Sequence, residues 1–161
     1  PSMVVTLGLD VGERRIGVAR GDPSGLLASP LTTIMRTSDR VAIEAIRSLV
    51  AEHGAHVLVV GLPLTAEGDA ESLQAQRIAA FGRRLRAIPG MRVVFWSERY
   101  STATAGEHLG VAGRRAPPRT ARQREASRRR LDAAAAAVIL QDYLDQQRQV
   151  RQSGQPAQSK P

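Results

Sequence analysis

The sequence has no cysteine, three histidines and only 3% aromatic residues. Without cysteine the chain can form neither a disulfide nor a thiolate metal site, so oxygen or imidazole must hold any metal. So few rings exclude a multi-ring platform for stacking unpaired bases. There is no apolar run of the roughly 20 residues that span a bilayer, and no signal-like apolar segment near the N-terminus. We therefore expect a cytoplasmic protein that does not meet a membrane.

Lysine is also scarce, because 22 of the 23 basic residues are arginine. The net charge is +8, and residues 114–130 alone hold eight arginines against Glu125. Such a dense cationic segment favours contact with phosphates, for which the arginine fork is well suited. The alternatives are a solvated insert and the codon bias of a GC-rich genome. The predicted nucleic-acid contacts are Arg14, Arg15, Arg99, Arg114, Arg115, Arg119, Arg122, Arg124, Arg128, Arg129 and Arg130.

Apolar periodicity and turn residues divide the chain into elements. Short β-branched runs predict strands over 4–11, 15–19, 26–34, 56–61 and 91–96. Helical spacing predicts helices over 38–53, 69–86, 102–109 and 131–147. The polar, Arg-rich stretch 113–130 is expected to be a flexible loop, and 150–161 a disordered tail. The length fits one domain over residues 1–149.

The element order is a three-strand meander followed by alternating helices and strands. Right-handed crossovers then give an α/β fold, a mixed five-stranded sheet with helices on both faces. This order matches the RNase H-like fold, whose strand order is 3-2-1-4-5.

Three carboxylates are candidate catalytic residues and metal ligands: Asp10, Glu98 and Asp132. Asp10 ends the most apolar strand, where α/β sheets usually bind ligands, although an Asp before Gly12 also suits a turn. Glu98 follows the fifth strand at the same edge, although a surface pair with Arg99 is the alternative. Asp132 is placed at the start of the last helix, where an acid is also stabilising without any function.

Three such acids predict a magnesium site, because magnesium prefers oxygen ligands, and manganese is expected to substitute. One or two ions held there would support hydrolysis of a phosphodiester that leaves a 5′-phosphate. The histidines offer no competing site.

Four motifs occur in order along residues 4–145: Leu7 to Gly12 with Arg15 to Ala19, Val60 to Leu64, Ser97 to Arg99, and Leu131 to Ala135. Together they resemble the YqgF (RuvX) family. The resemblance implies an RNase H-like nuclease that processes the 5′ end of precursor 16S rRNA, or a Holliday junction resolvase acting on branched DNA. The family's acidic residues fall on Asp10, Glu98 and Asp132.

The chain departs from the family pattern at Ser97 and Tyr100 and in its longer, Arg-rich segment. Tyr100 is a candidate for stacking on a nucleotide, although packing under a helix is the alternative. Two other functions remain open. Asp10 to Gly12 also resembles the phosphate loop of actin-like and sugar-kinase ATPases, but those enzymes need two such halves and 161 residues have room for one, so an ATPase is disfavoured. A non-catalytic RNA-binding protein is the other. A resolvase would further require a homodimer.

Overall fold

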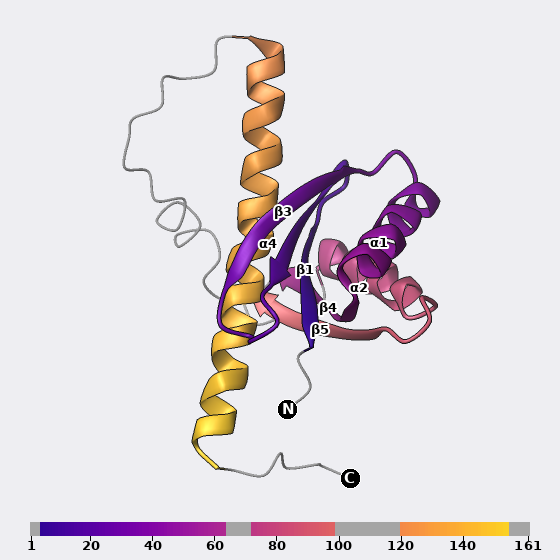
Figure 1. The fold of residues 1–161 in the computed structure, drawn as a ribbon. Coiled ribbons are helices and arrows are strands. Elements are labelled where there is room, and N and C mark those ends of the chain that lie inside the picture. The colour runs from indigo at the N-terminus through magenta and orange to yellow at the C-terminus, as the bar shows by residue number, and fades with distance from the viewer. Residues whose placement is uncertain (1–3, 64–71, 99–119, 155–161) are drawn as a thin grey trace.

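The computed structural model describes residues 4–63, 72–98 and 120–154, which form one sheet with helices on both faces (Figure 1). The elements in chain order are β1 (Val5–Val11), β2 (Arg15–Gly21), β3 (Ala28–Met35), α1 (Asp39–His53), β4 (Ala55–Pro63), α2 (Leu73–Leu85), β5 (Arg92–Glu98) and α4 (Ala121–Gln152). The strand order is β3-β2-β1-β4-β5, as predicted. The β1–β2 and β2–β3 pairs are antiparallel, and β4 is parallel to both β1 and β5.

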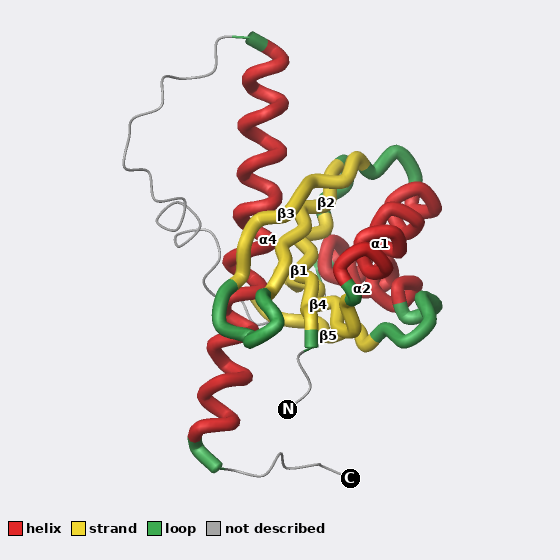
Figure 2. Tube along the Cα trace, viewed as in Figure 1, coloured by secondary structure: helices red, strands yellow, loops and turns green. Residues whose placement is uncertain are grey.

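The sheet is the middle of three layers, with α4 on one face and α1 and α2 on the other (Figure 2). Side chains alternate along β1 because successive residues of a strand face opposite sides. Leu7, Leu9 and Val11 belong to the core under α1 and α2. Gly8 lies on the opposite face, where an added Cβ would be 2.7 Å from the Leu140 Cβ of α4. Small residues on this face therefore let α4 lie directly on the sheet.

Local signals in the sequence set the ends of α1 and the β2–β3 turn as expected. The Ser38 side chain accepts a hydrogen bond from the Val41 amide, and Gly54 ends the helix at a φ of 63°. In the β2–β3 turn the Asp22 carboxylate accepts hydrogen bonds from the Leu26 and Leu27 amides. The Leu27 hydrogen bond, and then that from the Ser24 hydroxyl, lower the pKa of Asp22 below its ordinary value.

The prediction of a flexible loop over 113–130 is wrong for residues 121–130, which form the first part of α4. That prediction follows the apolar pattern, which begins only at Leu131. The helix begins instead at a capping box, in which Thr120 and Gln123 each hydrogen-bond the other's backbone amide. Glu125 and Arg129, one turn apart, add an ion pair of 3.5 Å. Good helix formers and a cap thus make a helix without a buried face.

The end of α4 also differs from the expected boundary at residue 147, because the helix continues to Gln152. Most of the expected tail, from residue 155 on, lies outside the described residues, as do the helix expected over 102–109 and residues 113–119. Although α4 has 32 residues, no helix in the described part of the chain is apolar enough to cross a membrane.

Candidate active site

Asp10 lies near the carboxyl end of β1 on the face that α4 covers. Its neighbours Leu9 and Val11 point into the core on the other side, and in the antiparallel register Asp10 is opposite Gly17 of β2. The side chain is half-buried. An acid in such a position needs a donor or a cation nearby, because burial disfavours a bare carboxylate.

Asp132 reaches the same place from the middle of α4. A Cβ on Gly17 would lie 1.9 Å from the Asp132 backbone oxygen, so the helix backbone rests on this glycine. Because Gly17 is also the register partner of Asp10, the backbones of both acids lie at the same position of β2. The expected location of Asp132 at a helix start is therefore wrong, and with it the interpretation of this acid as a partner of the helix dipole.

Glu98 is the last residue of β5, where its backbone is opposite Pro63 of β4. Its side chain lies outside the described part of the chain. Two residues earlier, Trp96 donates from Nε1 to a carboxylate oxygen of Asp142 over 2.7 Å and packs edge-on against Tyr143. These contacts attach the end of β5 to α4. Since β1, β4 and β5 are parallel, Glu98 ends at the same sheet edge as Asp10, with β4 between them.

Arg15 was predicted as a nucleic-acid contact, and in the structure it hydrogen-bonds Asp132 of the candidate site. Its Nε donates to Asp132 Oδ2 over 2.6 Å, and its Nη1 lies 4.0 Å from Glu125 Oε2. The hydrogen bond to Asp132 raises the pKa of Arg15 above its ordinary value, and the charges of Asp132 and Glu125 add to this while desolvation opposes it. Arg15 therefore stays charged and orients the Asp132 carboxylate.

Two carboxylates on one half-buried surface are a donor set that suits magnesium, which prefers hard oxygen ligands. Among the described residues no group of three acids or histidines is close enough to hold a metal ion. The third predicted ligand is Glu98, whose backbone ends at this edge. The oxygen ligands of this site thus fit a divalent cation in their chemistry.

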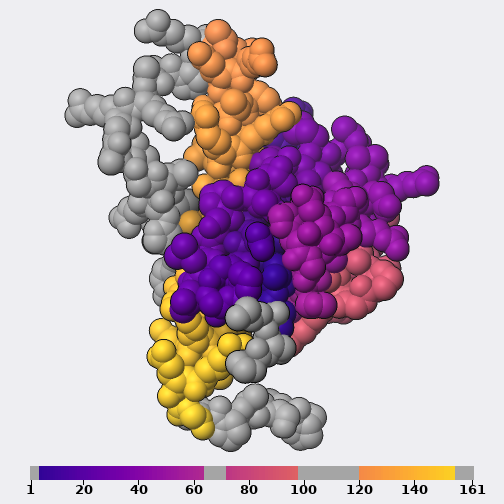
Figure 3. All heavy atoms as spheres, viewed as in Figure 1, coloured from indigo at the N-terminus to yellow at the C-terminus, as the bar shows by residue number. Residues whose placement is uncertain are grey.

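The first eleven residues of α4, 121–131, form what we call the arm. From Gly8 to Gly17 the contacts on α4 move from Leu140 back to Asp132, so the helix runs antiparallel to β1. The arm therefore continues past the carboxyl end of β1, for about 16 Å at 1.5 Å per residue. Figure 3 shows these residues, in orange, projecting from the described surface. A hydrogen bond of 2.6 Å from the Thr33 hydroxyl to the Arg129 carbonyl anchors its base.

The arm carries five of the predicted nucleic-acid contacts, all exposed: Arg122, Arg124, Arg128, Arg129 and Arg130. Against them stands Glu125, so the net charge of the arm is +4. Arg14 is exposed in the turn between β1 and β2. The remaining predicted contacts lie outside the described residues: Arg99, Tyr100, Arg114, Arg115 and Arg119.

Arg36, just after β3, was not among the predicted site residues. Its amide donates to the Arg14 carbonyl over 2.8 Å, and its Nη1 donates to the Gly12 carbonyl over 2.9 Å. Its Nε also donates to Asp39 Oδ1 over 2.8 Å. Arg36 therefore holds the turn that connects Asp10 to Arg15. Its bond to Asp39 is local, but no local sequence signal shows that it holds this turn, because Gly12 and Arg14 are more than 20 positions away.

Comparison with known proteins gives a consistent result along the whole described fold. Residues 4–146 match the family model described as RuvX, Holliday junction resolvase. A protein of Roseiflexus sp. (strain RS-1) named "Putative pre-16S rRNA nuclease" is 42% identical over 142 residues, which cover 88% of this chain and 94% of the relative. A protein of the same name from Syntrophus aciditrophicus (strain SB) is 42% identical over 139 residues, covering 86% of this chain and 87% of the relative.

Among solved structures, the chain is similar to Thermus thermophilus RuvC in complex with a Holliday junction substrate. The TM-score is 0.55 at 13% identity, covering 91% of this chain and 96% of that one. The fowlpox virus resolvase bound to Holliday junction DNA also gives 0.55, at 10% identity, covering 89% and 99%. At such low identity these likenesses concern the fold, and they confirm the predicted RNase H-like architecture.

Proposed function

The chain belongs to the RuvX family of nucleases, and we propose that it hydrolyses phosphodiester bonds in structured RNA, with the 5′ end of pre-16S rRNA as its substrate. One observation carries this proposal. Asp10 and Asp132 both lie at Gly17, at the end of the sheet past which the Arg-rich arm projects. The proposed catalytic acids and the proposed phosphate-binding arm therefore lie at the same end of the molecule.

Asp10, Asp132 and Glu98 are the proposed ligands of a magnesium ion, for which manganese can substitute. When bound, the ion would supply Lewis acidity to the attacking water and the leaving oxygen. Arg15 keeps the Asp132 carboxylate oriented through its 2.6 Å hydrogen bond. The arginines of the arm and Arg14 neutralise substrate phosphates and hold the strand at the site. Because these contacts are to the phosphate backbone of the substrate, substrate shape is expected to matter more than base sequence.

Cleavage of branched DNA is the second candidate, favoured by the description of the matching family model as a Holliday junction resolvase. We rank it below RNA processing. The relatives at 42% identity cover nearly the whole chain, whereas the resolvase structures share only the fold. Only this second function requires a homodimer, because paired nicks in a four-way junction require two active sites.

The test compares both substrates with the same protein preparations. Wild-type protein with magnesium is expected to cut precursor 16S rRNA near its 5′ end, and a chelator is expected to stop cutting. Asp10→Asn and Asp132→Asn should each reduce cleavage by at least about 1000-fold, a loss typical of removing a group that acts directly in catalysis. Binding and the melting temperature should change little.

Asp145→Asn is the matched control, since it is the same change on α4, about 13 residues beyond Asp132, where Asp145 pairs with Arg148. Full activity of either site variant would contradict the assigned acids. Symmetric nicking of four-way DNA with no RNA cleavage would favour the resolvase function. RNA binding without cleavage of either substrate would indicate a non-catalytic protein.

A further inference from the structure

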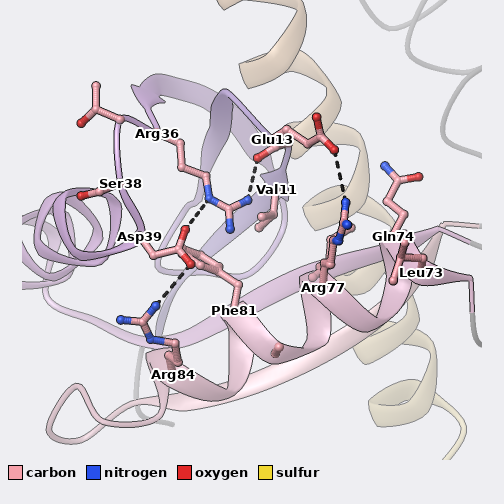
Figure 4. A pocket seen from close by; sticks show the side chains of 14 residues that line it. Val11, Glu13, Arg36, Ser38, Asp39, Leu73, Gln74, Arg77, Phe81 and Arg84 are labelled. Carbon is pink, nitrogen blue, oxygen red and sulfur yellow. Dashed lines mark hydrogen bonds and ion pairs between the residues drawn. The ribbon is translucent and has the colours of Figure 1, made fainter.

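A cavity of about 830 Å³ lies on the face of the sheet opposite α4, between the β1–β2 turn, the start of α1 and α2 (Figure 4). We call it the α2 cavity. Its walls are partly apolar, with Val11, Ile78 and Phe81 among the lining residues. Its volume is within the range of sites for ligands of nucleotide size.

Three arginines line the α2 cavity, and each has a carboxylate partner. Arg77 pairs with Glu13 at 3.6 Å, and Arg84 pairs with Asp39 at 3.2 Å. Arg36 also binds Asp39, and its guanidinium lies 4.7 Å from the centre of the Phe81 ring. With three cations and two carboxylates, the cavity has a net charge of +1.

The two outer arginines can exchange their partners for a phosphate. The side chains of Arg77 and Arg84 are 65% and 54% exposed, and Glu13 is 86% exposed. Exposed ion pairs contribute little stability, so little is lost when they open. A phosphodiester offers two oxygens to the same guanidinium groups, and binding it also releases counterions.

The α2 cavity and the candidate active site share the turn between β1 and β2. Gly12 and Glu13 line the cavity, and Asp10 precedes them by only two residues. Asp10 faces α4, while Val11 faces the cavity, so the acids and the cavity lie on opposite sides of one turn. A strand that crosses the sheet edge at Asp10 therefore passes from one to the other within a few nucleotides.

We propose that the α2 cavity binds an unpaired nucleotide of the substrate RNA that flanks the cleaved bond, with Arg77 and Arg84 on the two phosphates on either side of it. The base stacks on the guanidinium of Arg36, which itself covers the buried Phe81 ring. This proposal rests on the proposed function, since it assigns a second contact to the same substrate strand.

The experiment measures binding of labelled precursor 16S rRNA across a range of salt concentrations, in an Asp10→Asn background so that the RNA is not consumed. Adding Arg77→Gln and Arg84→Gln should weaken binding roughly 10-fold at 0.15 M salt and lower the salt slope by about 1.4, the value for two single-strand phosphate contacts. The matched control is Arg47→Gln with Arg83→Gln, which removes the same charge from exposed positions that do not line the cavity. This control should change the affinity about 2-fold or less.

A second variant changes binding in the opposite direction. Glu13→Gln removes a carboxylate that competes for Arg77, so it should tighten RNA binding by about 3-fold. The proposal is overturned if the double variant of Arg77 and Arg84 binds RNA like its control, or if Glu13→Gln leaves RNA affinity unchanged. It is also overturned if these substitutions change the affinity for free adenosine monophosphate but not for the RNA. Wild-type protein that neither binds nor cuts the RNA would instead refute the proposed function. If the wild-type protein cuts the RNA but the cavity variants bind it with unchanged affinity, only the proposed role of the α2 cavity is refuted.

Discussion

Two segments of α4, the arm and the packed half over residues 132–144, share one backbone conformation but differ in composition and surroundings. The arm, residues 121–131, is mostly exposed and carries five arginines. The half from Asp132 to Leu144 lies on the sheet and contributes seven buried residues: Ala133, Ala134, Ala136, Ile139, Leu140, Tyr143 and Leu144. A helix can therefore be continuous while the forces that form it change along its length.

Because of this difference, the packed half stabilises the fold, whereas the arm offers side chains to a substrate. The packed half is held by apolar burial and by close approach to Gly8 and Gly17. The arm is held by its cap, helix propensity and a few polar contacts near its base. Because its arginines are not needed for packing, they are available to a ligand. Variants matched between the two halves test this division.

The largest effect is expected from shortening a leucine in the packed half. Leu140 is fully buried, whereas Leu131 in the arm is 53% exposed. Leu140→Ala should lower the free energy of unfolding by about 3 kcal/mol, because it loses burial and leaves a cavity. Leu131→Ala should cost less than about 0.5 kcal/mol. Denaturant unfolding measures both, and equal losses would mean that the arm packs as tightly as the rest.

A methyl group added at Gly17 should cost about 2 kcal/mol, because it would overlap the Asp132 backbone oxygen at 1.9 Å. It should also lower nuclease activity, since the helix must move and carry Asp132 away from Asp10. Gly25→Ala is the comparison. Its Cβ meets nothing within 4 Å, and its cost comes only from a φ of 73°. If Gly25→Ala reduced activity as much as Gly17→Ala, general instability would explain both.

Loss of the capping box should loosen the arm alone. Thr120→Ala removes the acceptor for the Gln123 amide and should cost about 1 kcal/mol of local helix stability. Amide hydrogen exchange in the arm should then be roughly 5-fold faster, while global unfolding changes little. The corresponding change at α1, Ser38→Ala, should lower global stability instead, because α1 packs in the core. A global loss with Thr120→Ala would contradict an independent arm.

The smallest effect on unfolding, less than about 0.5 kcal/mol, is expected when the five arginines of the arm are changed to glutamine. RNA binding should nevertheless weaken, with the salt slope falling by about 2 to 4 as phosphate contacts are lost. The control removes five exposed arginines elsewhere: Arg40, Arg47, Arg83, Arg92 and Arg151. An equal change in slope for both sets would assign the effect to net charge rather than to the arm.

Much of the fold could be predicted from local patterns. The short β-branched run of β1, the capping residue Ser38 and the helix-ending Gly54 are short-range features, and the structure confirms the elements that they indicate. The strand order follows from the handedness of crossovers and from the family resemblance. The loop predicted over 121–130 is wrong. That prediction assumed that a segment without an apolar face does not form a helix.

The sequence by itself determined most of the described elements and, through crossover handedness and its motifs, the strand order and the candidate acids, because periodicity and motifs are short-range properties of the chain. Only the tertiary structure decided which of these acids meet. Asp132 lies beside Asp10 because Gly17 lets the α4 backbone approach the sheet, and Arg15 binds an acid 117 positions away. The role of Arg36 and the α2 cavity likewise depends on contacts between distant segments, which no local pattern specifies.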